Sequence, residues 1–106
     1  MYFDGTTLTA LLSDPEKAAA IPAEGPRYTS PLAVIEAAIE LPDLGEDELT
    51  NFLDAQRIEL RDMPPGSHLV TGALATDGAL NARLHAACAG YYETDVFVLT
   101  DAPQAD

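Results

Sequence analysis

Residues 1–12 read MYFDGTTLTALL: an apolar segment, one aspartate, a small hydroxyl-bearing turn and a second apolar stretch. The apolar residues before Asp4 predict a short buried strand, which would deliver that carboxylate to its carboxyl end, where open parallel sheets bind ligands. Gly5 permits a close turn, and Thr6 or Thr7 can cap a following helix. A second interpretation stays open, in which Asp4 is only a cap or turn residue.

The remainder of the chain continues this alternation of strands and helices. Helices are expected to start at Ser13–Glu16 and at Ser30–Pro31. Three further helices are expected over residues 46–56, more weakly over 66–75, and over 79–89. Strands are expected at 27–29, at 58–60 and at 95–100, where Val96-Phe97-Val98-Leu99 gives the clearest strand pattern. This order predicts a single α/β domain over residues 1–106, with a short central parallel sheet covered on both faces.

The charge balance limits the kinds of binding partner that the chain favours. Eighteen acids stand against five bases, which gives a formal net charge of −13, and no basic stripe is present. Free RNA or DNA would be repelled at long range, whereas a basic protein or a cation held among carboxylates is more compatible. An acidic surface that serves only solubility is the simplest alternative.

The hydropathy pattern bears on location. No segment approaches the ~20 apolar residues of a membrane span, and the N-terminus lacks the layout of a signal peptide. We therefore expect a cytoplasmic protein with no membrane partner.

Three acids occupy notable positions in this layout. Asp4 ends the first expected strand, and Asp101 follows the last one. Glu36 lies in SPLAVIEA (residues 30–37), among apolar and small residues. Either Glu36 points into a polar cleft, or it lies on the exposed side of an amphipathic helix, as is expected of Glu40. Periodicity does not decide between the two.

Several segments together resemble PIN domains, particularly the VapC toxins of type II toxin-antitoxin systems. The resemblance is carried by residues 4–12, by residues 30–37, and by the Ala-rich residues 84–89 followed by 96–101. It implies an α/β/α sandwich whose carboxylates hold Mg²⁺ or Mn²⁺ and hydrolyse RNA, a chemistry suited to hard divalent ions. Carried over, Asp4, Glu36 and Asp101 would be the catalytic and metal-ligating acids, and Thr6 a substrate-binding hydroxyl.

The chain departs from the family pattern at the start of the Ala-rich helix. The family has a further aspartate there, but residues 81–85 read NARLH, with Ala82 in the preferred register and Leu84 as the alternative. Arg83 either fills the space of the missing cation or is a solvated helix residue. The sequence therefore predicts a degenerate VapC-like protein that acts by protein binding, such as antitoxin capture or dimerisation. Two alternatives are a weak Mg²⁺-dependent endoribonuclease, with RNA as its partner, and an unrelated small acidic α/β domain.

Apolar residues between 32 and 53 predict a two-fold homodimer, the commonest closed symmetry. Together they offer enough apolar area for a core face and a contact surface. The alternative is that the core of one chain uses them all. The residues concerned are Leu32, Ile35, Ile39, Leu49, Phe52 and Leu53.

Overall fold

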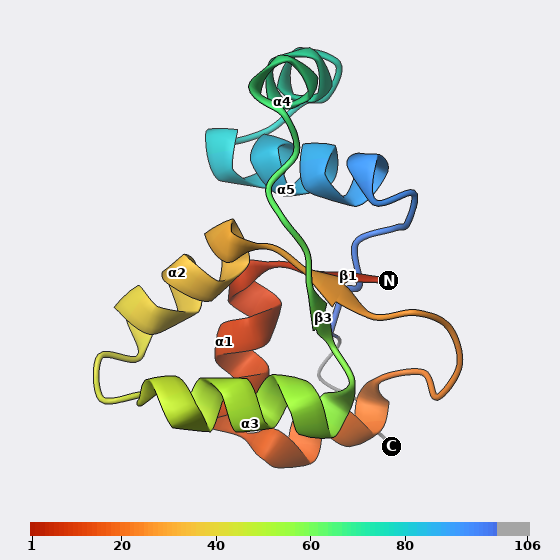
Figure 1. The fold of residues 1–106 in the computed structure, drawn as a ribbon. Coiled ribbons are helices and arrows are strands. Elements are labelled where there is room, and N and C mark those ends of the chain that lie inside the picture. Colours follow the sequence, from red (N-terminus) through yellow and green to blue (C-terminus); the bar gives the residue numbers. More distant parts are fainter. Residues whose placement is uncertain (100–106) are drawn as a thin grey trace.

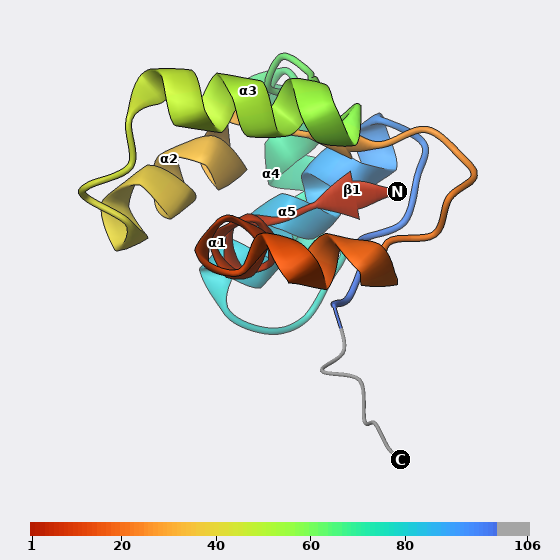
Figure 2. The same ribbon diagram turned by 90° about the horizontal axis from the view of Figure 1, so that it is seen from below.

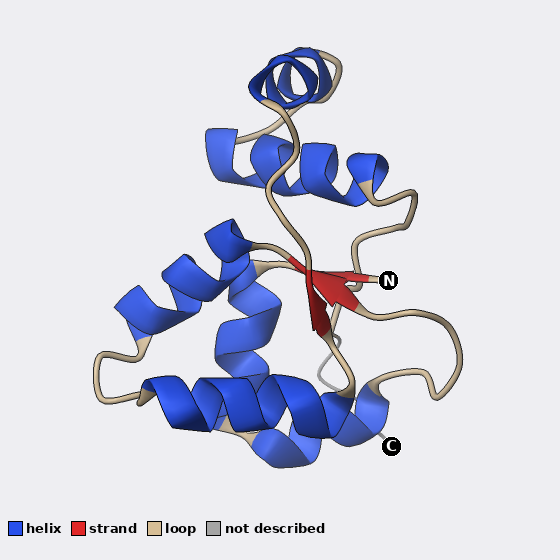
Figure 3. Cartoon of the chain, viewed as in Figure 1, coloured by secondary structure: helices blue, strands red, loops and turns tan. Residues whose placement is uncertain are grey.

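The computed structural model describes residues 1–99 and confirms the α/β fold class (Figures 1 and 3). In chain order the elements are β1 (Tyr2–Phe3), α1 (Gly5–Ser13), the 3₁₀ helix η1 (Pro15–Ala20), β2 (Tyr28–Thr29), α2 (Pro31–Glu40), α3 (Glu46–Gln56), β3 (Glu59–Leu60), α4 (Gly66–Leu74) and α5 (Leu80–Tyr91).

The three strands form a short parallel sheet in the order β1-β2-β3. Tyr2 pairs with Tyr28, which in turn pairs with Glu59. Because all strands run in the same direction, the residues that follow them emerge at one edge of the sheet. The helices that start there, α1 and α2, bring their first turns to the same edge.

The prediction of a strand over residues 95–100 is wrong for residues 95–99, and Thr100 lies outside the described range. Only Val96 forms a bridge, parallel to Tyr2, through hydrogen bonds from Tyr2 N to Asp95 O and from Phe97 N to Tyr2 O. Both residues of β1 pair with β2, but only Tyr2 pairs with the described part of this segment. The apolar pattern instead reflects side-chain packing, with the Phe97 ring 5.3 Å from that of Phe3.

Helices cover both faces of the sheet (Figures 1 and 2). Successive residues of a strand point to opposite faces, and β1 follows this rule with two fully buried side chains. Phe3 packs with α1, α2 and α3 in one core, and Tyr2 packs with α5 in a second. Helix α4 packs on α5, where Gly72 lies directly against Ala87. Within residues 1–99, no helix combines the length and apolar character that crossing a membrane requires.

Candidate functional site

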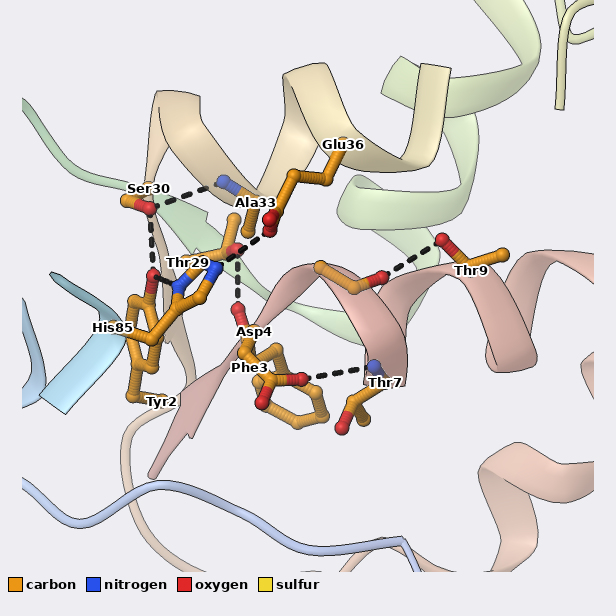
Figure 4. Close-up of polar contacts among 11 residues, drawn as sticks. Tyr2, Phe3, Asp4, Thr7, Thr9, Thr29, Ser30, Ala33, Glu36 and His85 are labelled. Carbon is orange, nitrogen blue, oxygen red and sulfur yellow. Dashed lines mark hydrogen bonds and ion pairs between the residues drawn. The ribbon is translucent and has the colours of Figure 1, made fainter. Parts of the chain in front are cut away.

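A buried polar network lies where β1, β2, α2 and α5 meet (Figure 4). Tyr2 comes from β1, Ser30 follows β2, Glu36 lies on the second turn of α2, and His85 lies in the middle of α5. Tyr2 and Ser30 are fully buried, and His85 is 4% exposed. The network therefore joins segments that are up to 83 residues apart in the chain.

With one proton on the His85 ring, the contacts of this network can be assigned a self-consistent direction. The Tyr2 hydroxyl lies 2.7 Å from Ser30 Oγ and 2.6 Å from His85 Nδ1, and His85 Nε2 lies 2.5 Å from Glu36 Oε1. Ser30 Oγ already accepts from the backbone N–H of Ala33, so its own proton is available for Tyr2. We therefore assign donation from Ser30 to Tyr2, from Tyr2 to His85, and from His85 to Glu36.

Electrostatics support this assignment. Burial raises the pKa of the Tyr2 phenol well above its usual value, so Tyr2 keeps its proton and remains a donor. His85 Nδ1 then accepts, and the proton on His85 Nε2 faces the Glu36 carboxylate. Every hydroxyl and ring nitrogen of the network has a partner, as buried polar groups require.

Gly5 allows Glu36 to approach the start of α1. A Cβ atom at residue 5 would lie 2.6 Å from Glu36 Cβ and 2.7 Å from Glu36 Cδ, closer than carbon atoms pack. Glycine is thus needed here because α2 passes close to α1, and not because of an unusual backbone angle. The sequence interpretation of Gly5 as a turn residue missed this contact.

Asp4 and Thr6 lie at the start of α1. Asp4 is the N-cap residue, and its Oδ1 accepts from the backbone N–H of Thr7 at 2.9 Å. Asp4 therefore caps α1, and its role as a metal ligand stays a prediction. Figure 4 shows the Asp4 carboxylate directed toward Thr7, whereas the Glu36 carboxylate is directed toward His85.

Thr6 and Glu36 share an open pocket of about 290 Å³. The Glu36 side chain is 24% exposed, which agrees with the polar-cleft interpretation rather than with a fully solvated face. This pocket is lined by Gly5, Thr6, Thr9, Glu36, Ile39, Glu40 and Asn81. It contains hydroxyl, amide and carboxylate groups beside one apolar wall.

The predicted set of three metal ligands is only partly described. Asp101 lies outside residues 1–99. Within that range, no group of three or more His, Cys, Asp or Glu side chains is arranged to hold a metal ion. Asp4 and Glu36 each use one carboxylate oxygen in a protein contact. The described residues alone do not form a three-ligand site, and the full set with Asp101 stays a prediction.

His85 is the residue that sequence reasoning missed. It belongs to the segment 81–85 where a further acid was sought, but the expected register placed Ala82 or Leu84 at that position. Arg83 does not fill a cation space beside Glu36: its guanidinium donates to the carbonyls of Gly78 and Ala73. The only available signal was an isolated histidine in an Ala-rich helix.

The comparisons with known proteins provide no relative. No family model, no curated protein and no solved structure matches this chain. The resemblance to PIN domains therefore remains a hypothesis that rests on the sequence segments quoted above.

Proposed function

We propose that this chain is a degenerate VapC-like PIN domain that acts by binding protein rather than by cleaving RNA. The observation that carries the proposal is the contact between His85 and Glu36. Where a metal-dependent nuclease would use another acid, α5 presents an N–H donor to the carboxylate. This donor occupies one carboxylate oxygen that a divalent ion would otherwise bind.

Helix α2 supplies the contact surface for this function. Ile35 and Ile39 lie one turn apart and are 56% and 70% exposed. Leu53 is buried, and Leu49 and Phe52 pack against the core. The core of one chain therefore does not use all the apolar side chains of this region, and the Ile35–Ile39 face is available to a second copy.

Light scattering tests this association. The wild type should have about twice the 11.2 kDa mass of one chain at micromolar concentration, and Ile39→Glu should be monomeric. Val70→Glu is a matched control, because Val70 is a similarly exposed side chain on α4. A monomeric wild type, or a dimer lost only in Val70→Glu, would contradict association through α2.

Antitoxin capture is the second form of protein binding that we propose. The net charge of −13 favours a basic partner over an acidic one. A small antitoxin gene directly upstream would support this form, and co-purification of its product with the chain would test it.

A weak Mg²⁺- or Mn²⁺-dependent endoribonuclease is the alternative function. It is favoured by the shared pocket of Thr6 and Glu36, to which Glu40 adds a second carboxylate. Broadening of the Gly5 and Thr6 amide NMR signals by micromolar Mn²⁺ would support it. No broadening below millimolar Mn²⁺ would support the degenerate form.

A further inference from the structure

Another pocket shares no lining residue with the Glu36 pocket. It lies between residues 61–65, which follow β3, and residues 91–92 at the C-terminal end of α5. Its volume is about 380 Å³, and it is lined by Arg61, Asp62, Met63, Pro65, Tyr91 and Tyr92. A single cation thus faces aromatic and apolar walls in a strongly acidic protein.

Arg61 is held in place by aromatic rings. Its Cζ lies 5.0 Å from the centre of the Tyr28 ring and 5.5 Å from that of the Tyr92 ring. Tyr92 is fixed in turn, because its hydroxyl donates to the backbone carbonyl of Asp62 at 2.7 Å. These contacts place the guanidinium over two aromatic rings.

The two terminal nitrogens of the Arg61 guanidinium have no hydrogen-bond partner among residues 1–99. Within the same range, its one ionic contact is made by Nε, 3.7 Å from Glu59 Oε2, and its side chain is 40% exposed. Arg27 and Arg83 differ, since their guanidinium groups donate to backbone carbonyls. Arg61 is therefore a donor pair without a protein acceptor in the described part of the chain.

We propose that this pocket binds a monocarboxylate that carries an adjacent aromatic or apolar group. The two terminal nitrogens of a guanidinium match the two oxygens of a carboxylate in a bidentate contact. The ring of Tyr91, which is 44% exposed, and the side chains of Met63 and Pro65 would contact the apolar group. A doubly charged phosphate is disfavoured, because Asp62 lines the same pocket and the chain has a net charge of −13.

Two sources present this chemistry: a free aromatic amino acid and the C-terminus of a peptide. Asp62 distinguishes them, because only the free amino acid carries an ammonium group next to its carboxylate. Calorimetry with phenylalanine, N-acetylphenylalanine and phenylalaninamide separates the sources. Tighter binding of phenylalanine identifies the amino acid, and tighter binding of N-acetylphenylalanine identifies the peptide terminus. Phenylalaninamide, which has no carboxylate, should not bind.

Variants of the full chain test the role of Arg61. Arg61→Gln should weaken carboxylate binding about 10-fold or more. Arg61→Lys, which keeps the charge but loses the fork, should also weaken it. Arg57→Gln removes the same charge outside this pocket and should bind as the wild type does. The proposal is overturned if neither carboxylate binds, if Arg61→Gln and Arg61→Lys both bind as the wild type, or if phenyl phosphate binds more tightly than N-acetylphenylalanine.

Discussion

Gly5→Ala tests the close contact between α1 and Glu36. The added methyl group would lie 2.6 Å from Glu36 Cβ, so a rotation of the Glu36 side chain cannot relieve the overlap. Overpacking of this kind costs about 1–3 kcal/mol. If the Glu36 carboxylate is displaced, His85 Nε2–H loses its buried acceptor, which adds about 1–3 kcal/mol.

The total cost of Gly5→Ala is therefore about 2–6 kcal/mol in the free energy of unfolding. For a chain of this length, it corresponds to a fall in Tm of roughly 8–24 °C, at about 4 °C per kcal/mol. Urea denaturation followed by circular dichroism measures the free energy, and a thermal scan measures Tm. Gly90→Ala is the control, because no atom lies within 4 Å of a Cβ at that position, and it should be neutral or slightly stabilising.

Variants at Glu36 test whether its Cβ atom causes the overlap with Ala at position 5. Glu36→Ala should rescue Gly5→Ala only in part: the carboxylate that could be displaced is already absent, but the Cβ atom that causes the overlap is still present. Glu36→Gly removes that atom, so the double variant Gly5→Ala/Glu36→Gly should be no less stable than Glu36→Gly alone. A cost below about 0.5 kcal/mol for Gly5→Ala, or equal rescue by both Glu36 variants, would refute the contact.

Three further predictions follow from the structure. Tyr2→Phe should destabilise the fold by about 1–3 kcal/mol in urea denaturation, because His85 Nδ1 loses its buried donor; a cost near zero would contradict the network. Gly72→Ala should speed hydrogen exchange of α4 amides, because its Cβ would lie 2.7 Å from Ala87 Cβ; unchanged exchange would contradict this packing. Burial raises the pKa of the Tyr92 phenol to about 12, so the folded state keeps a proton that the unfolded state loses above about pH 10. Stability should therefore fall between pH 10 and 12, and the urea midpoint of Tyr92→Phe should fall less over this range.

The local elements could be predicted from the sequence because their signals are local. Glu46, Asp47 and Glu48 fill the first turn of α3, and Ser30 caps α2 ahead of Pro31. Such signals depend on a few neighbouring residues, and the boundaries of α3 agree with the expectation over 46–56. The segment 95–99 shows the limit of this reasoning, because the length of its ladder depends on a partner strand elsewhere in the chain.

The candidate site depends on contacts that no local pattern encodes. His85 and Glu36 are 49 residues apart, and nothing near either residue indicates the other. The requirement for glycine at position 5 likewise comes from α2 and not from the turn that it begins. Asp4 could be interpreted in two ways, since a cap and a metal ligand use the same carboxylate at the same strand end.

Metal-dependent cleavage of a structured RNA by the unmodified chain is the most direct test of the central claim. We expect no cleavage above background with Mg²⁺ or Mn²⁺, because His85 holds one oxygen of Glu36. His85→Asp places an acid at the α5 position that contacts Glu36, and it should bind Mn²⁺ more tightly than the wild type in calorimetry. Robust metal-dependent cleavage by the wild type, abolished by Asp4→Asn, would contradict the degenerate, protein-binding account.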